Sequence, residues 1–322
     1  MKRSASAAPH PRDVTASRRL RAFAACAAVV AAAGLAGAVR ADDDPIMGTG
    51  QERELRSGGM TRTYRVVPSH VTSNLGKALV IVLHGGFGTA QGAQDAYGWD
   101  GVASFSSAEI VYPEGFGRSW NAGRCCGPAH DRNIDDVRFL TDVIRDAERR
   151  DGIDPKRVFV TGMSNGAMMA YRMACEGRIS LAGIGPVAGD LEVPCTSPVA
   201  PVSVMAIHGT ADENVPFAGG VNRKGFVRVN HTSVADSVGR WRAIDRCEAP
   251  GAERRGPMLR ETSYCADGTA VVLVTVDGAG HQWPGSRPPP PEAARLLQLD
   301  QPSTVLNATV TLWIFFLPQS AR

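Results

Sequence analysis

The chain has 322 residues and a formal net charge of +3 at pH 7. Its first 41 residues hold seven Lys or Arg and one Asp, so the remainder carries a formal net charge of −3. That remainder has no cationic excess to bind nucleic acid or anionic lipid, so both classes of partner are excluded. Its length suits one large α/β domain, because such domains often reach about 250 residues.

The N-terminal residues have the pattern of a signal peptide. Three arginines between positions 18 and 21 precede an apolar run from Ala22 to Val39, and small side chains follow up to Ala41. The run is mostly Ala and Gly, which is weakly apolar for a membrane span, so we expect cleavage after Ala41 and no stable membrane anchor. The sequence therefore predicts a secreted or periplasmic protein, and it does not distinguish between the export routes. The predicted parts of the chain are a signal peptide (1–41), a flexible N-terminal segment (42–59) and a single catalytic domain (60–318).

The cysteines agree with export. Seven are present, and six remain once Cys26 leaves with the signal peptide, which is an even number suited to disulfides in an oxidising compartment. Cys247 and Cys265 flank a loop that contains Gly and Pro, so we predict a bond between them. The pairing of the other four stays open: Cys125, Cys126, Cys175 and Cys195. No metal site is expected, because the chain has no CxxC pairs with nearby histidines.

Short apolar runs alternate with amphipathic stretches along the chain. The runs predict buried strands over 78–83, 158–161, 202–207 and 271–276. The amphipathic stretches predict helices over 134–149, 165–175, 232–243 and 303–316. Continuous apolar strands between helices indicate an α/β fold with a doubly wound, mostly parallel sheet and helices on both faces.

One serine lies at the turn between a predicted strand and a helix. Gly162, Met163, Ser164, Asn165 and Gly166 form a G-x-S-x-G pattern at this turn. The glycines allow a tight turn that holds the hydroxyl outward, and the following helix N-terminus favours developing negative charge. The sequence therefore predicts that Ser164 is a nucleophile in an α/β-hydrolase fold.

A serine nucleophile needs a base and an acid, which in this fold follow it in the order acid, then histidine. Asp212 stands after the strand predicted over 202–207, and we assign it as the acid; Asp190 and Glu213 are the competing carboxylates. His281 stands after the last predicted strand, between glycine-rich neighbours, and we assign it as the base.

The oxyanion of an acyl transfer needs two backbone N–H donors. The residue after the nucleophile, Asn165, supplies one by position. The second comes from the loop after an early strand, where Gly86 is the preferred donor and Phe87 the alternative.

These motifs, with Ser119 to Gly123 and Cys125-Cys126-Gly127, resemble those of secreted polyhydroxybutyrate depolymerases and feruloyl esterases. The resemblance covers most of residues 60–316, and its most specific parts are His208 to Pro216 and His281 to Gly285, which are similar to H-G-x-x-D-x-x-V-P and G-H-x-W-P-G. It implies a triad of Ser164, Asp212 and His281. This chain departs from the family at Gly86-Phe87-Gly88, where many relatives carry a cysteine or serine.

The expected function is hydrolysis of carboxylic esters through an acyl-enzyme, without metal or cofactor. Feruloyl, acetyl or hydroxyalkanoate oligomer esters derived from plant cell walls or polyesters are the candidate substrates, and Trp120 and Trp283 are candidate substrate contacts. Two alternatives stay open: an acyltransferase to cell-wall or sugar alcohols, and a non-catalytic binding protein on a hydrolase scaffold.

Overall fold

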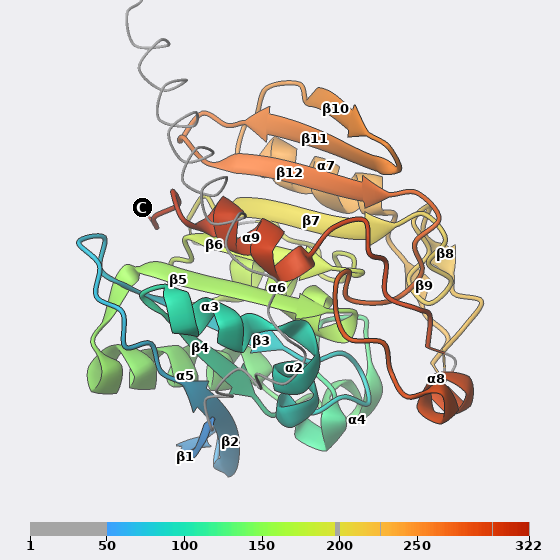
Figure 1. Ribbon diagram of the computed structural model, residues 1–322. Helices are drawn as coiled ribbons and strands as arrows, with labels where there is room; N and C mark the ends of the chain where they lie inside the picture. The colour runs from blue at the N-terminus through green and yellow to red at the C-terminus, as the bar shows by residue number, and fades with distance from the viewer. Residues whose placement is uncertain (1–49, 197–199, 226, 298, 322) are drawn as a thin grey trace, which may run out of the picture. The chain divides into compact units, whose positions relative to one another are not determined.

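The computed structural model describes residues 50–196, 200–225, 227–297 and 299–321 (Figure 1). The chain divides into two units, residues 1–47 and 48–322, and all described residues belong to the second. The predicted signal peptide therefore lies outside the described residues. Within the described ranges, no helix combines the length and the apolar character needed to cross a membrane.

A ten-stranded sheet forms the centre of the described unit, in the order β1-β2-β4-β3-β5-β6-β7-β12-β11-β10. Neighbouring strands from β4 to β12 in this order are parallel, whereas β2 pairs with β4, and β11 with β12, in antiparallel fashion. The mostly parallel sheet predicted from the apolar runs is confirmed. The strands are β1 (Gln51–Ser57), β2 (Met60–Val67), β3 (Lys77–Leu83), β4 (Ala108–Pro113), β5 (Ile153–Met163), β6 (Gly183–Val187), β7 (Ser203–Gly209), β10 (Gly251–Arg255), β11 (Met258–Tyr264) and β12 (Ala270–Val276).

Helices cover both faces of this sheet, as predicted. Alternate residues of β3 divide between two cores: Leu79 and Ile81 belong to one, and Val80 and Val82 to the other. Helices α5 (Asp136–Asp151), α6 (Asn165–Glu176) and α7 (Val234–Ile244) contribute to the first core, and α2 (Ala90–Tyr97), α3 (Trp99–Phe105) and α9 (Ala308–Phe316) to the second. Figure 1 shows α3 and α9 in front of the sheet and α7 behind it.

Smaller elements complete the described unit. They are the short helices α4 (Gly127–Asp131) and α8 (Pro291–Leu297), a 3-10 turn at Phe116–Arg118, and a separate two-stranded ribbon of β8 (Gly220–Val221) and β9 (Asn230–His231). The last long helix begins at Ala308, five residues later than predicted, because Asn307 caps it by accepting a hydrogen bond from the Val310 amide.

The N-terminal boundary of the sheet differs from the prediction. The segment 42–59 was expected to be flexible, but its described part, from residue 50 onward, forms β1. This strand pairs with β2 through a two-residue turn at Gly58-Gly59, where both glycines have positive φ. Arg53 and Ser57 of β1 bond to Asp151 and Asp142 of α5. These side-chain bonds order a strand whose outer positions are too polar to show as an apolar run.

Three disulfides lie in the described unit. Cys247 and Cys265 are bonded to each other, as the sequence predicts. The pairings that the sequence left open are Cys175–Cys195 and the adjacent Cys125–Cys126. The first of these joins the last turn of α6 to the loop after β6.

Candidate active site

Ser164 occupies a sharp turn between β5 and α6. Its backbone has φ 55° and ψ −123°, a region that residues with a Cβ rarely adopt. A Cβ added to Gly162 would lie 2.8 Å from the Gly166 carbonyl, and one added to Gly166 would lie 2.6 Å from the Leu83 carbonyl oxygen. The two glycines therefore allow the strand, the helix and the end of β3 to pack closely around the serine.

His281 and Asp212 form a hydrogen-bonded pair. The His281 Nδ1 atom lies 2.7 Å from Asp212 Oδ2, and both side chains are buried. The other oxygen, Asp212 Oδ1, accepts hydrogen bonds from the amides of Asn214 (2.9 Å) and Val215 (2.8 Å). Burial opposes ionisation of Asp212, but the neighbouring imidazoles of His281 and His208 outweigh it and hold the pKa of this carboxyl well below its usual value.

Asp300 supports the backbone of His281. Its Oδ2 atom accepts a hydrogen bond from the His281 amide (2.8 Å), and its Oδ1 atom lies 2.9 Å from the Lys224 Nζ atom. A Cβ on Gly280 would overlap the Asp300 carboxylate. This role of Asp300 was not predicted, because the residue follows a proline-rich loop and belongs to no motif.

The candidate oxyanion donors lie side by side. A Cβ built on Gly86 would be 3.9 Å from the Cβ of Asn165, and both residues line the same cavity as Ser164. The Phe87 amide donates instead to the Arg118 carbonyl (2.8 Å). This bond occupies the alternative donor, so the geometry favours the Gly86 amide.

His84 fixes the loop that carries Gly86. Its Nε2 atom accepts from the Gly115 amide (3.0 Å), so the proton is on Nδ1, which donates to the Gly85 carbonyl (2.8 Å). Burial lowers the pKa of His84 to about 4. A neutral, fully bonded histidine is a structural element of the loop.

The predicted substrate contacts at Trp120 and Trp283 are not supported, because both side chains are completely buried and neither lines the cavity. Trp120 donates from Nε1 to the His84 carbonyl (2.9 Å), and its backbone N and O both bond to the Asn165 side chain. Trp283 stacks on Tyr97, with ring centroids 4.4 Å apart. The loops that carry the tryptophans fold back on the domain, so the indoles pack beneath the site.

Ser164 and His281 line one cavity of about 570 Å³. Its walls are largely apolar and include Tyr97, Met163, Met168, Val215, Val229, Pro288 to Pro290, Leu299 and the Cys125–Cys126 disulfide. A concave apolar pocket of this size with a few polar groups is typical of a small-molecule site. The structure thus brings Ser164, Gly86, Asn165 and the His281–Asp212 pair to one pocket.

Comparisons with known proteins also indicate an esterase. The family model described as Phospholipase/Carboxylesterase matches residues 131–238. The putative esterase NocK of Nocardia uniformis subsp. tsuyamanensis is 31% identical over 256 residues, which cover 72% of this chain and 74% of NocK. The chain belongs to this esterase family of the α/β-hydrolases. By family it is a carboxylic ester hydrolase.

More distant relatives of this esterase differ in name and in length. Feruloyl esterase B of Piromyces equi is 25% identical over 66% of this chain and 41% of its own length, and poly(3-hydroxyalkanoate) depolymerase C of Paucimonas lemoignei is 27% identical over 70% and 53%. The chain therefore spans about half the length of these two relatives. A solved acetyl xylan esterase from Aspergillus awamori shares the fold, with a TM-score of 0.54 and 15% identity over 78% of this chain and 100% of that one.

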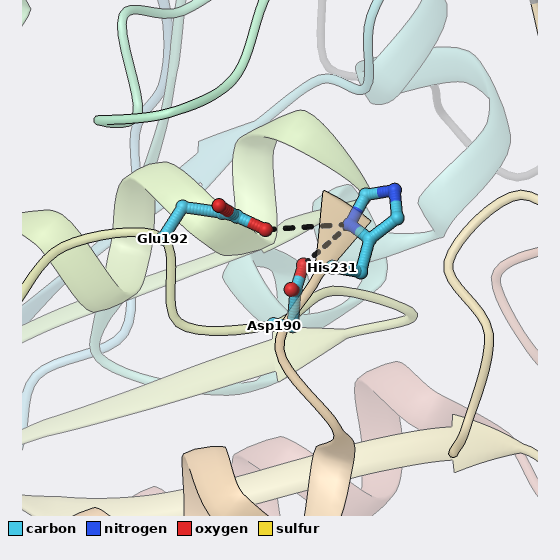
Figure 2. A group of neighbouring side chains, drawn as sticks. All are labelled: Asp190, Glu192 and His231. Carbon is cyan, nitrogen blue, oxygen red and sulfur yellow. Dashed lines mark hydrogen bonds and ion pairs between the residues drawn. The ribbon is translucent and has the colours of Figure 1, made fainter. Parts of the chain in front are cut away.

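A second group of buried ionisable side chains lies in the esterase. The group consists of Asp190, Glu192 and His231 (Figure 2). One carboxylate oxygen of each acid and one ring nitrogen of the histidine all lie within 4.8 Å of one another. Asp190, a competing acid in the sequence, bonds to His231 rather than to His281. The sequence did not reveal this group, because Asp190 and Glu192 follow β6 whereas His231 ends β9, far along the chain.

Proposed function

We propose that this protein is an exported serine esterase in which Ser164 is the nucleophile, His281 the base and Asp212 the acid. The observation that carries the proposal is that the strained turn at Ser164 and the His281–Asp212 pair lie at one cavity. Three disulfides are typical of proteins in an oxidising compartment and support the export part of the proposal.

The bond between Asp212 and Nδ1 of His281 leaves the opposite ring nitrogen, Nε2, to accept a proton. In the first step the Ser164 oxygen bonds to the ester carbonyl carbon while its proton moves to His281 Nε2. The amides of Gly86 and Asn165 donate to the resulting oxyanion. Collapse of the tetrahedral intermediate breaks the carbon–oxygen bond of the ester, and His281 returns the proton to the leaving alcohol.

The second step repeats this chemistry with water. His281 takes a proton from water, the hydroxyl adds to the acyl carbon, and the proton returns to the Ser164 oxygen as the carboxylic acid leaves. Apart from the ester and water, no group outside the chain takes part in either proposed step. Deacylation restores the free serine.

The cavity favours a soluble ester with an apolar acyl or alcohol part. Pockets of about 300 to 1,000 Å³ hold small molecules, and the apolar walls suit a hydroxycinnamoyl group or a short hydroxyalkanoate oligomer. Relatives named as feruloyl esterase and poly(3-hydroxyalkanoate) depolymerase support these two substrate classes equally.

Ser164→Ala tests the nucleophile. We expect kcat on 4-nitrophenyl butyrate to fall at least about a thousandfold, because removal of a triad nucleophile leaves only binding and oxyanion stabilisation. A fluorophosphonate probe should label Ser164 in the unaltered protein, as located by peptide mass spectrometry. Full activity of the alanine variant would refute the assignment.

The substrate class is tested with methyl ferulate, acetylated sugars and hydroxybutyrate oligomers. We expect the free acid as the product, also when an acceptor alcohol is present. Predominant transfer of the acyl group to that alcohol would instead identify an acyltransferase.

A further inference from the structure

His231 lies in the wall of the cavity but has no part in the proposed chemistry. It ends β9, and its Nδ1 atom lies 3.1 Å from Asp190 Oδ1 and 3.4 Å from Glu192 Oε1. Both carboxylates are buried, and so is the imidazole. Figure 2 shows the other ring nitrogen pointing away from the two acids. We call these three residues the imidazole clamp.

Each acid of the clamp is held in place by a second group. Asp190 Oδ2 accepts a hydrogen bond from the Thr232 amide (2.7 Å), and Glu192 Oε2 lies 2.9 Å from the Nε atom of Arg124. Burial and the neighbouring Asp190 raise the pKa of Glu192 to about 7, so Glu192 is only partly ionised at neutral pH. When both acids are ionised, the single guanidinium of Arg124 leaves one negative charge. A protonated His231 balances that charge, whereas a divalent cation would leave the group with an excess positive charge.

The two acids favour the charged imidazole. Burial alone would lower the pKa of His231, but the hydrogen bonds and charges of Asp190 and Glu192 outweigh it and raise the pKa to about 9. His231 therefore carries two N–H donors at neutral pH, one of which faces the acids.

The second donor has no partner within the described part of the chain. The hydrogen bonds and ion pairs of the His231 ring there are made through Nδ1, and the residue lines the same cavity as Met168, Val229 and the Cys125–Cys126 disulfide. A charged donor in an apolar wall is matched best by an anionic oxygen, because charge-assisted hydrogen bonds are roughly twice as strong as neutral ones.

We propose that the imidazole clamp is a binding site for a carboxylate group of the substrate, which accepts a hydrogen bond from His231 Nε2. This inference rests on the proposed esterase function and narrows it. The enzyme should prefer ester substrates that carry a free carboxylate, in the acyl part or in the alcohol part, over uncharged esters of the same length.

Two matched pairs of substrates test the clamp. 4-Nitrophenyl hemiglutarate against 4-nitrophenyl pentanoate places the charge in the acyl part, and the hydroxybutyrate dimer acid against its methyl ester places it in the alcohol part. For at least one pair we expect His231→Gln to reduce the charged-to-neutral ratio of kcat/KM about tenfold or more, the size expected for a hydrogen bond to a charged group. The change should appear in KM for the charged substrate, with kcat on the neutral substrate within about threefold.

Arg287→Gln is the matched control, because Arg287 is a second cation that lines the same cavity. We expect this variant to leave both ratios within about twofold of the unaltered enzyme, because Arg287 is exposed and an exposed ion pair contributes little. Unchanged ratios in His231→Gln, or ratios that fall in Arg287→Gln instead, would overturn the proposal.

Two further measurements use the unaltered protein and do not depend on the variant folding. In a ¹⁵N NMR titration, glutarate should shift the Nε2 resonance of His231, and no shift at saturation would contradict the site. Metal analysis should find no stoichiometric divalent cation; one equivalent bound at this group would identify a metal centre and overturn the proposal. If 4-nitrophenyl pentanoate is not hydrolysed at all, the esterase proposal fails, while the titration still reports on the clamp.

Discussion

Asp212→Asn should remove most of the turnover while the fold stays intact. Asp212 Oδ1 accepts hydrogen bonds from the amides of Asn214 and Val215, so the carbonyl oxygen of an asparagine must take the same place. Its NH₂ group then faces His281 Nδ1, where the carboxylate oxygen now lies at 2.7 Å. Because that NH₂ group can only donate, Nδ1 must accept, and the proton moves to Nε2. An imidazole with its proton on Nε2 cannot take the proton of Ser164.

The size of the effect follows from the lost charge. A carboxylate and an imidazolium whose charges are about 4 Å apart attract by about 4 kcal/mol at an effective dielectric constant of about 20. Since each 1.36 kcal/mol in the barrier is tenfold in rate, the lost charge alone lowers kcat about a thousandfold. The wrong tautomer adds to this loss, so we expect a reduction of about 10³ to 10⁴.

The assay is kcat on 4-nitrophenyl butyrate at neutral pH, with the melting temperature as a control for folding. Glu213→Gln is the matched variant, because Glu213 is the adjacent carboxylate, is partly exposed and pairs with Lys224 at 3.1 Å. It should keep kcat within about twofold, as is usual for an exposed ion pair. An Asp212→Asn enzyme with more than a tenth of the original kcat would refute the reasoning, as would an equal loss in Glu213→Gln.

Three further predictions concern the surroundings of the site. His84 stays neutral in the folded protein because its pKa is lowered to about 4, whereas in the unfolded chain its pKa is near 6.5. The free energy of unfolding should therefore fall by about 3 kcal/mol as the pH drops from above 6.5 to 4, because the unfolded chain gains a proton first. Urea unfolding at pH 7 and pH 4 should show a smaller loss of stability for His84→Gln than for the unaltered protein, and equal losses would contradict the assignment. Gly280→Ala should displace the Asp300 carboxylate and lower kcat/KM about tenfold to a hundredfold without unfolding the protein; unchanged kinetics would show that Asp300 does not position the base. Replacing Cys247 and Cys265 together with serine should reduce the free energy of unfolding by about 3 kcal/mol, because a loop of 18 residues is no longer closed, while kcat is retained; an unchanged denaturation midpoint would refute this.

The central sheet was predictable because its strands are buried on both faces. β3, β7 and β12 are continuous apolar runs, which periodicity recognises. The antiparallel edge strands were not predictable in this way. β10, for example, is exposed at every position and has the sequence Gly-Ala-Glu-Arg-Arg, so only its pairing with β11 makes it a strand.

The candidate triad was predictable because each member follows a recognisable strand in a fixed order. The supporting residues were not, because their roles depend on loops that meet only in the folded protein. Asp300 reaches the His281 amide from the far side of a proline-rich loop, and Asp190 meets His231 across 41 residues of sequence. The prediction that Trp120 and Trp283 contact the substrate was wrong for the same reason. Their proximity in sequence to the motifs does not determine whether the indoles face the cavity or the interior of the domain.

In the proposed mechanism, the backbone at Ser164 places catalysis and stability in opposition at one residue. Residues other than glycine in sparsely populated backbone regions cost of order 1 to 3 kcal/mol, so a glycine at position 164 would relieve the fold while it removed the hydroxyl. A lineage that no longer needed the hydroxyl would therefore gain robustness by losing it. A serine at a position where the backbone favours glycine is what selection for chemistry, rather than for folding, would produce.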